Sequence, residues 1–202
     1  MVTNDSRKDV EPFNRWSHSY DDSWIRRYAD RVHVEMLNVV TNENAAPNIV
    51  LDVGCGTGRL LRKGRALYPS AQLFGIDPAD GMVEVARSQI PSATIYLAAA
   101  ESLPLADSSV DVVLSSISFH HWSDQLAALR EISRVLRPGG CFCLADISMP
   151  AWLTKLFRHS KIKSPAAVSQ LLSETGLRVK VQHGTFTRFI LLTLGVKGSK
   201  GV

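Results

Sequence analysis

The segment around residue 54 constrains the fold most strongly, because an apolar run meets three alternating glycines there. Residues 49–53 read Ile-Val-Leu-Asp-Val, which is typical of a buried strand. Gly54, Gly56 and Gly58 follow, and an apolar pattern with helical spacing begins directly after them. Glycine allows backbone conformations that are closed to other residues, and the first turn of a helix offers free N–H groups to a polar ligand. The segment therefore predicts a strand, a tight turn and a helix that together hold a cofactor.

The spacing of the glycines separates one kind of cofactor site from another. The dinucleotide-binding motif G-x-G-x-x-G/A ends in a small residue, and Arg59 stands in its place. The Gly-Lys-Ser/Thr ending of a phosphate-binding P-loop is missing. Asp52 lies just before the loop, where its charge would repel a pyrophosphate and would suit a ligand with an ammonium group. A plain turn with three chance glycines is the alternative, and the pattern favours the cofactor site.

Length and composition limit the class of protein. At 202 residues the chain suits one domain that buries about 70% of its unfolded surface. No apolar run reaches the roughly 18 residues of a membrane span, and residues 1–11 lack the apolar core of a signal peptide. The odd number of cysteines and their spacing favour a reducing compartment and predict neither a disulfide framework nor a metal site. We therefore expect a cytoplasmic protein with a disordered tail over 1–11 and one domain over 12–202.

Strand and helix patterns alternate along the chain. Strands are expected over residues 49–53, 71–76, 94–98, 110–115, 141–147, 179–183 and 189–196. Helices are expected within residues 12–40 and over 60–68, 82–89, 124–136, 151–158 and 165–175. This alternation is typical of a doubly wound, parallel sheet, whereas the last two strands lack a helix between them and should form an antiparallel edge hairpin. The expected fold is α/β and Rossmann-like, with a mostly parallel, seven-stranded sheet.

Six sequence pieces, in a consistent order, carry a family resemblance. They are 51–58 (Leu-Asp-Val-Gly-Cys-Gly-Thr-Gly), 74–82 (Phe-Gly-Ile-Asp-Pro-Ala-Asp-Gly-Met), 100–105 (Ala-Glu-Ser-Leu-Pro-Leu), 110–115 (Val-Asp-Val-Val-Leu-Ser), 119–122 (Phe-His-His-Trp) and 136–140 (Leu-Arg-Pro-Gly-Gly). Together they resemble class I S-adenosylmethionine (SAM)-dependent methyltransferases, particularly the group that contains the ubiquinone and menaquinone biosynthesis enzymes. The resemblance implies SAM as the cofactor and a small molecule as the methyl acceptor.

The resemblance also implies which residues contact the cofactor. Asp77 ends the second strand and would accept hydrogen bonds from the ribose hydroxyls, with a helix-capping role before Pro78 as the alternative. Met82 would pack on the adenine, with a place in the core as the alternative. Similar proteins carry an acid where this chain has Ala99, so adenine recognition would pass to backbone or to Glu101. The expected cofactor-binding residues are Asp52, Gly54, Cys55, Gly56, Gly58, Asp77, Pro78, Met82, Ala100, Glu101, Ser115 and Tyr20.

Two histidines follow the fourth strand, where the acceptor would enter. His120 and His121 are candidates for a general base, because histidine titrates near neutral pH. A purely structural role of this pair is the alternative, since similar proteins with many different substrates carry it.

The segments around the acceptor side limit the substrate class. Residues 115–119 lack the Pro-Pro-aromatic patch of DNA and RNA amino-methyltransferases, which disfavours nucleic acid. An N-terminal helical cover over 12–46 and a lid over 148–164 are expected to enclose a small hydrophobic or aromatic acceptor. The lid holds a basic cluster: Lys155, Arg158, Lys161 and Lys163. A solvated face of a packed lid is favoured over contact with a membrane surface.

Two other functions remain open from the sequence. A nicotinamide-dependent oxidoreductase would also need an acid after the second strand, but the glycine spacing and the missing Tyr-x-x-x-Lys pair argue against it. A non-catalytic SAM-binding module would keep the cofactor site without an acceptor site. The sequence does not indicate the oligomeric state.

Overall fold

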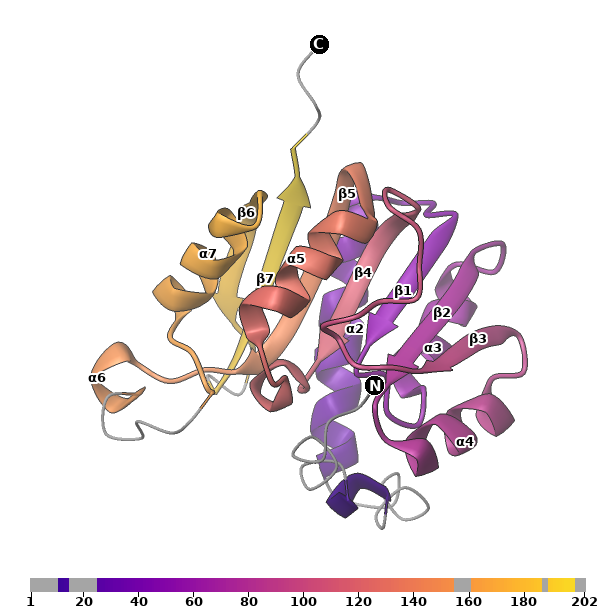
Figure 1. The fold of residues 1–202 in the computed structure, drawn as a ribbon. Helices are drawn as coiled ribbons and strands as arrows, with labels where there is room; N and C mark the ends of the chain where they lie inside the picture. Colours follow the sequence, from indigo (N-terminus) through magenta and orange to yellow (C-terminus); the bar gives the residue numbers. More distant parts are fainter. Residues whose placement is uncertain (1–10, 15–24, 155–160, 187–188, 199–202) are drawn as a thin grey trace.

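A seven-stranded sheet forms the centre of the fold, with the strand order β3-β2-β1-β4-β5-β7-β6 (Figure 1). The computed structural model describes residues 11–14, 25–154, 161–186 and 189–198. The strands are β1 (Ile49–Val53), β2 (Gln72–Asp77), β3 (Ala93–Leu97), β4 (Val110–Ser116), β5 (Leu136–Ile147), β6 (Leu177–Gly184) and β7 (Ile190–Lys197). β7 runs antiparallel to β5 and β6, and the other paired strands are parallel. The expected α/β fold with an antiparallel hairpin at one edge is confirmed.

One strand begins earlier than expected. β5 starts at Leu136, which pairs with Val110, although the Pro-Gly-Gly sequence predicted a turn before residue 141. The register between β4 and β5 shifts after this pair and resumes where Cys141 pairs with Val112. Gly139 has a left-handed φ of 80°, so the extra residues bulge out of the ladder while the strand continues on both sides.

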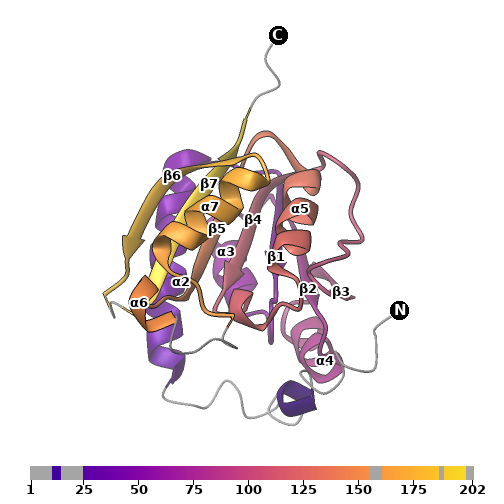
Figure 2. The same ribbon diagram turned by 60° about the vertical axis from the view of Figure 1, so that its left-hand side comes forward.

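Helices cover both faces of the sheet (Figure 2). They are α2 (Ile25–Glu43), α3 (Arg59–Leu67), α4 (Asp80–Gln89), the 3₁₀ turn η2 (Phe119–His121), α5 (Gln125–Val135), α6 (Ala151–Thr154) and α7 (Pro165–Glu174). Of the expected helix over 151–158, the described part is α6, because residues 155–160 lie outside the described ranges, as do Lys155 and Arg158. Residues 1–10 of the expected tail and Tyr20 also lie outside them.

Two apolar clusters, one on each face, hold the layers together. Val32 and Met36 of α2 pack with Leu61 of α3 against one face of the sheet. Leu129 of α5 and Leu172 of α7 pack against the other face. The three cysteines are buried and free. Among the described residues, no helix combines the length and the apolar character needed to cross a membrane.

The order of the strands decides where a ligand can bind. From β1 the chain runs outward through β2 to β3 and then returns to β4 on the other side of β1. A crevice opens at the carboxyl ends of β1 and β4, because the connections leave these strands in opposite directions. The glycine loop follows β1, and residues 117–121 follow β4, so both lie at this switch point.

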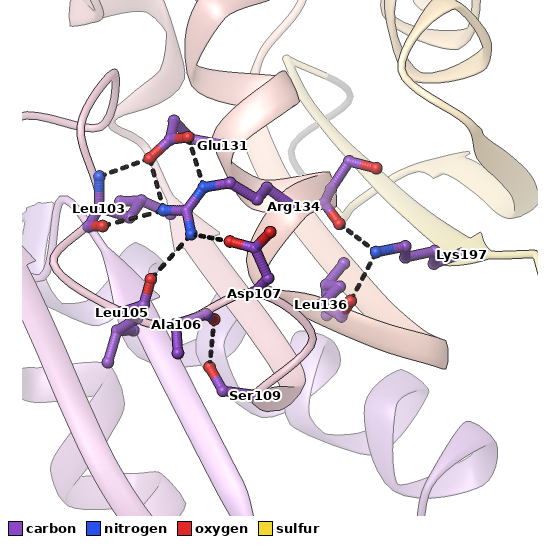
Figure 3. A network of polar contacts seen from close by, with 10 residues as sticks. Leu103, Leu105, Ala106, Asp107, Ser109, Glu131, Arg134, Leu136 and Lys197 are labelled. Carbon is purple, nitrogen blue, oxygen red and sulfur yellow. Dashed lines mark hydrogen bonds and ion pairs between the residues drawn. The ribbon is translucent and has the colours of Figure 1, made fainter.

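A cluster of hydrogen bonds around Arg134 holds the β3–β4 connection against α5 (Figure 3). The Arg134 guanidinium donates to both oxygens of Glu131, at 2.7 and 2.8 Å, and to Asp107 Oδ1 at 2.6 Å. It also donates to the carbonyl oxygens of Leu105 and Leu103, at 2.9 and 3.0 Å. The hydrogen bonds to Glu131 and Asp107 hold the pKa of Arg134 above its usual value. The connection leads from the β2–β3 side of the sheet to β4, and Glu131 also holds it by accepting from the N–H of Leu103 at 2.9 Å.

Candidate functional site

The glycine loop combines positions that need glycine for packing with one that faces open space. Gly54 and Gly56 have left-handed φ values of 75° and 53°. A Cβ atom on Gly54 would lie 2.4 Å from Ser118 Oγ, so only glycine lets the two loops approach each other. A Cβ atom on Gly56 would meet nothing within 4 Å. The backbone at Gly56 is therefore open to a ligand at the end of β1.

Asp77 ties the glycine loop to the end of β2. The backbone N–H of Gly56 donates to Asp77 Oδ2 at 2.8 Å, and the N–H of Ala79 donates to Oδ1 at 2.9 Å. Each carboxylate oxygen has a second lone pair, so the carboxylate can still accept two further hydrogen bonds, as two ribose hydroxyls would require. Asp77 also fixes the turn that leads into α4. The N-cap of α4 is Ala79, which has no side-chain cap, so Asp77 holds the turn before the helix and does not cap it, and ribose binding stays a prediction.

Asp52 is a buried carboxylate without a complete set of partners. The residue is 2% exposed, and its Oδ1 atom has no hydrogen-bond partner. Burial raises the pKa of Asp52 to about 8, and the charge of Asp77 adds to the rise. Burial also raises the pKa of Asp77 to about 6, against the lowering effect of the N–H groups of Ala79 and Gly56. A cation beside Asp52 would stabilise its ionised form, so this position fits the ammonium group of SAM.

Met82 and Cys55 are two of the expected cofactor-binding residues, and both are buried. Met82 is 2% exposed, which fits the alternative of a place in the core, and its contact with the adenine stays a prediction. Cys55 belongs to the cluster under α2 and α3, and burial raises the pKa of its thiol well above the usual value. Only the backbone of Cys55 is therefore a candidate contact, and its N–H already donates to the Ile76 carbonyl at 3.0 Å.

The remaining expected cofactor residues have varied surroundings. Pro78 is exposed, and Ala100 is buried in the cluster under α5 and α7. Glu101 Oε1 accepts from the N–H of Asp124 at 3.0 Å, so this side chain is engaged at the start of α5. Ser115 is fully buried and shares a 2.8 Å hydrogen bond with Ser118. Ser115 therefore supports the loop that contacts Gly54.

The loop after β4 is held in a strained conformation. Ile117 has a φ of 53°, which is unfavourable for a β-branched residue. Its N–H donates to the Ala145 carbonyl at 2.7 Å, and Ser118 Oγ donates to the Val53 carbonyl at 3.1 Å. These bonds fix the loop between β1 and β5 and place η2 beside the crevice.

His120 is paired with Asp146, a carboxylate at the ligand-binding end of the strands that has no specific role assigned from the sequence. Asp146 Oδ1 lies 2.6 Å from His120 Nδ1, and Asp146 Oδ2 accepts from the backbone N–H of His120 at 2.7 Å. An ionised carboxylate can only accept, so the proton sits on Nδ1 and Nε2 is left as an acceptor. Asp146 ends the segment 141–147, and the position of an acid at the carboxyl end of a strand was the available signal.

His121 contacts the N-terminal segment instead. Its ring centroid lies 3.9 Å from that of His120, and the ring of Phe13 meets it edge-on at 5.1 Å. Asn14 Oδ1 accepts from the N–H of Gly81 at 3.0 Å. Residues 11–14 therefore reach from the start of α4 to η2. Among the described residues, no cluster of three or more His, Cys, Asp or Glu side chains could hold a metal ion.

Comparison with known proteins gives the family. A methyltransferase-domain model matches residues 51–144. An uncharacterized methyltransferase of Mycobacterium tuberculosis is 42% identical over 96 residues, which are 48% of this chain and 38% of that protein. The malonyl-[acyl-carrier protein] O-methyltransferase of Dechloromonas aromatica is 34% identical over 179 residues, which are 83% of this chain and 64% of that protein. The chain thus spans less than two-thirds of the length of these relatives.

A further relative and a solved structure match over larger shares of their length. The solved structure is a methyltransferase in complex with the Trm112 activator of Haloferax volcanii, with a TM-score of 0.76, 24% identity, and coverage of 92% of this chain and 97% of that one. At this identity it shows the fold. An uncharacterized methyltransferase of Anoxybacillus flavithermus is 31% identical over 147 residues, which are 69% of this chain and 68% of that protein. Because this likeness extends over most of both proteins, we conclude that the chain belongs to the class I SAM-dependent methyltransferases.

Proposed function

We propose that this protein transfers a methyl group from SAM to a small hydrophobic or aromatic acceptor that binds beside His120. The observation that carries the proposal is the buried, incompletely paired carboxylate of Asp52 next to the open backbone of Gly56. A buried carboxylate without partners is unfavourable, and a cationic ligand would remove the penalty. Family membership sets aside the nicotinamide-dependent oxidoreductase.

Four features would hold the cofactor. Asp52 would bind the ammonium group, the backbone around Gly56 would hold the methionine part, Asp77 would accept from the ribose, and Met82 would pack on the adenine. When bound, SAM would supply an electrophilic methyl group on a positively charged sulfur, and a nucleophile that attacks the methyl carbon would displace S-adenosylhomocysteine as the neutral leaving group. The protein's main contribution is alignment of the acceptor, which can lower a barrier by about 7–11 kcal/mol.

His120 would act as the general base where the acceptor must lose a proton. Nε2 of His120 takes the proton, and the ionised Asp146 stabilises the imidazolium that forms. A base of this kind contributes about 10²–10⁴-fold to the rate. His121 is more exposed and contacts Phe13, so it is better placed to pack against the N-terminal segment than to accept a proton.

Apolar side chains support the proposed acceptor class. Phe119, Leu144 and Leu191 line a recess that also contains His120. One relative is named for methylating a malonyl group on an acyl carrier protein, so malonyl thioesters belong in any panel of acceptors.

The proposal is tested by binding and turnover on the same preparations. We expect SAM to bind in calorimetry, and Asp77→Ala to weaken binding at least tenfold. The Asp111→Asn variant is the control, because Asp111 binds backbone N–H groups of Asn48 and Ile49, at 2.9 and 2.8 Å, at the opposite end of β1. Failure of the wild-type protein to bind SAM would overturn the proposal. Binding without formation of S-adenosylhomocysteine over a broad panel would instead support the non-catalytic module.

A further inference from the structure

Two lysines line the recess that contains His120. Lys161 and Lys163 lie on the segment before α7 and line this recess together with Phe119 and His120 of η2. Both residues are half-buried. We infer that the acceptor carries an anionic group, a carboxylate or a phosphate ester, which these two lysines bind. The inference rests on the proposed function, because it describes the acceptor side of the same site.

The two lysines differ from the other described lysines in lacking a partner. Lys63 pairs with Asp30 at 3.1 Å, and Lys180 pairs with Glu43 at 2.6 Å. Lys197 donates to the carbonyl oxygens of Ser133 and Leu136, at 2.6 and 2.7 Å (Figure 3). Within the described part of the chain, Lys161 and Lys163 have neither an ion pair nor a side-chain hydrogen bond.

The carboxylate in the recess does not neutralise the lysines. Asp146 Oδ1 is bound by His120 Nδ1 and by the N–H of Ile147, at 2.6 and 2.7 Å, and Oδ2 is bound by the N–H of His120. Asp146 thus has three donors, and the lysine charges remain in excess. Two like charges beside an apolar wall repel each other and attract an anion, because the low local dielectric strengthens both effects.

The backbone that carries the lysines is fixed in place. Gln125 is 8% exposed, and its Nε2 donates to the carbonyl oxygens of Lys161 and Phe119, at 2.9 and 3.0 Å. Ser148 Oγ donates to the carbonyl oxygen of Lys163 at 3.0 Å. Gln125 thereby joins the lysine segment directly to η2. Anion binding would need little ordering of the backbone, which favours affinity.

Apolar side chains line much of the rest of the recess. Val168 and Leu191 are 4% and 7% exposed and face it from α7 and β7. The carbonyl oxygen of Phe189 accepts from the N–H of Ser148, which lines the recess, at 2.9 Å. The acceptor would then be an amphipathic organic anion, with its charge on the lysines and its apolar part toward α7 and β7.

Matched small probes test the inference. Calorimetry at low ionic strength compares benzoate, phenyl phosphate and the neutral benzamide, with and without S-adenosylhomocysteine. We expect at least one anion to bind ten times more tightly than benzamide, and the tighter anion identifies the group. The K161Q/K163Q double variant should lose this preference at least tenfold, whereas Arg178→Gln, which removes an exposed charge on β6, should keep it. The K161R/K163R variant should also keep it.

The outcomes separate this inference from the proposed function. Equal affinity for benzoate, phenyl phosphate and benzamide would overturn the inference, as would an unchanged preference in the folded K161Q/K163Q variant. If that variant fails to fold, the salt dependence of binding to the wild-type protein gives a second measurement. Added salt should weaken the binding of benzoate and phenyl phosphate and leave the binding of benzamide unchanged. SAM binding is measured on each variant. If SAM binds and the anions show no preference, the inference alone fails. If SAM does not bind, the proposed function fails whatever the anions do.

Discussion

Asp146 holds His120 through both the ring and the backbone of the histidine. Oδ1 lies 2.6 Å from Nδ1, and Oδ2 accepts from the N–H of the same residue at 2.7 Å. The two bonds orient the imidazole relative to the end of β5 and leave Nε2 as the acceptor. Neighbouring segments fix each partner, since Ile147 donates to Asp146 and Trp122 packs edge-on against Phe119 in η2. Asp146 therefore orients His120 in the protein without a bound acceptor.

Removing the base should affect turnover and leave cofactor binding intact. For His120→Ala we expect the rate of S-adenosylhomocysteine formation to fall about 10²–10⁴-fold. The affinity for SAM should change less than threefold, because the cofactor groups lie at the ends of β1 and β2. The His121→Ala variant is the control and should retain most of the rate. Equal losses for the two variants would contradict the assignment of the base.

Asp146 is a positioning residue, so its removal should act through His120. In Asp146→Asn the side-chain amide no longer provides a charge for the imidazolium. The value of kcat should fall by one to two orders of magnitude, whereas the affinity for SAM and the KM for the acceptor should stay nearly constant. A loss that appears mainly in thermal stability, with kcat unchanged, would indicate a structural role instead.

Cofactor binding should depend on pH through Asp52. The pKa of this carboxyl is raised to about 8, so it is largely protonated at pH 6 to 7 and must lose its proton to pair with an ammonium group. SAM affinity should therefore rise with pH up to about 8, with release of a proton on binding. Calorimetry in buffers of different ionisation enthalpy measures that proton. In Asp52→Asn the affinity should be lower and this part of the pH dependence should vanish.

The same carboxyl should make the free protein less stable as pH rises. Between its usual pKa of 3.8 and its raised value of about 8, Asp52 binds more protons in the folded state than in the unfolded state. The free energy of unfolding therefore falls with rising pH across this window. Above pH 8, Asp52→Asn should be more stable than the wild type by roughly 1–3 kcal/mol. Denaturant titrations of both proteins at pH 5 and pH 8.5 check this. If the stability advantage of Asp52→Asn over the wild type became smaller as pH rises, the prediction would be contradicted.

Gly54→Ala and Gly56→Ala, two substitutions in the glycine loop, should affect different properties of the protein. Both residues have left-handed φ values, which cost alanine about 1–2 kcal/mol. Gly54→Ala adds a clash with Ser118 and should lose a further 1–3 kcal/mol of stability, about what overpacking costs. Gly56→Ala meets no protein atom within 4 Å, so its added effect should be a fall in SAM affinity of at least tenfold. Thermal melts measure the loss of stability, and calorimetry measures the loss of SAM affinity. A larger loss of SAM affinity in Gly54→Ala than in Gly56→Ala would show that the backbone of Gly56 does not face the cofactor.

Local chemistry explains which parts of the site could be predicted from the sequence. The strand, the glycines and the helix are consecutive, so their spacing alone predicts the turn around Gly54. The parallel alternation likewise places Asp77 beside the loop. The His120–Asp146 bond joins residues 26 positions apart, and no periodicity indicates which carboxylate faces which histidine. The basic cluster of Lys155, Arg158, Lys161 and Lys163 is expected from the sequence to be a solvated face, and its charge in the sequence does not show whether an acid lies nearby.

Some elements departed from prediction for a similar reason. The Pro-Gly-Gly sequence has the composition of a turn, yet the pairing of Leu136 with Val110 keeps the chain beside β4 on both sides of the glycines. The glycines form a bulge there, and tertiary pairing extends the strand to the residues before it. Glu101 Oε1 accepts from the N–H of Asp124, a contact that the sequence did not indicate because the packing of α5 creates it, and the expected role of Glu101 toward adenine stays a prediction.

The Arg134 cluster should link stability to cofactor binding (Figure 3). Lysine keeps the charge but cannot donate to Glu131, Leu103 and Leu105 together, so Arg134→Lys should lose about 1–3 kcal/mol of stability. The exposed Arg130 on the same helix is the matched control, and Arg130→Lys should be neutral. Because Ala99 and Glu101 lie on the connection that Arg134 fixes, hydrogen exchange over 98–109 should quicken and SAM affinity should fall a fewfold. Faster exchange with unchanged affinity would show that this connection does not contribute to the cofactor site.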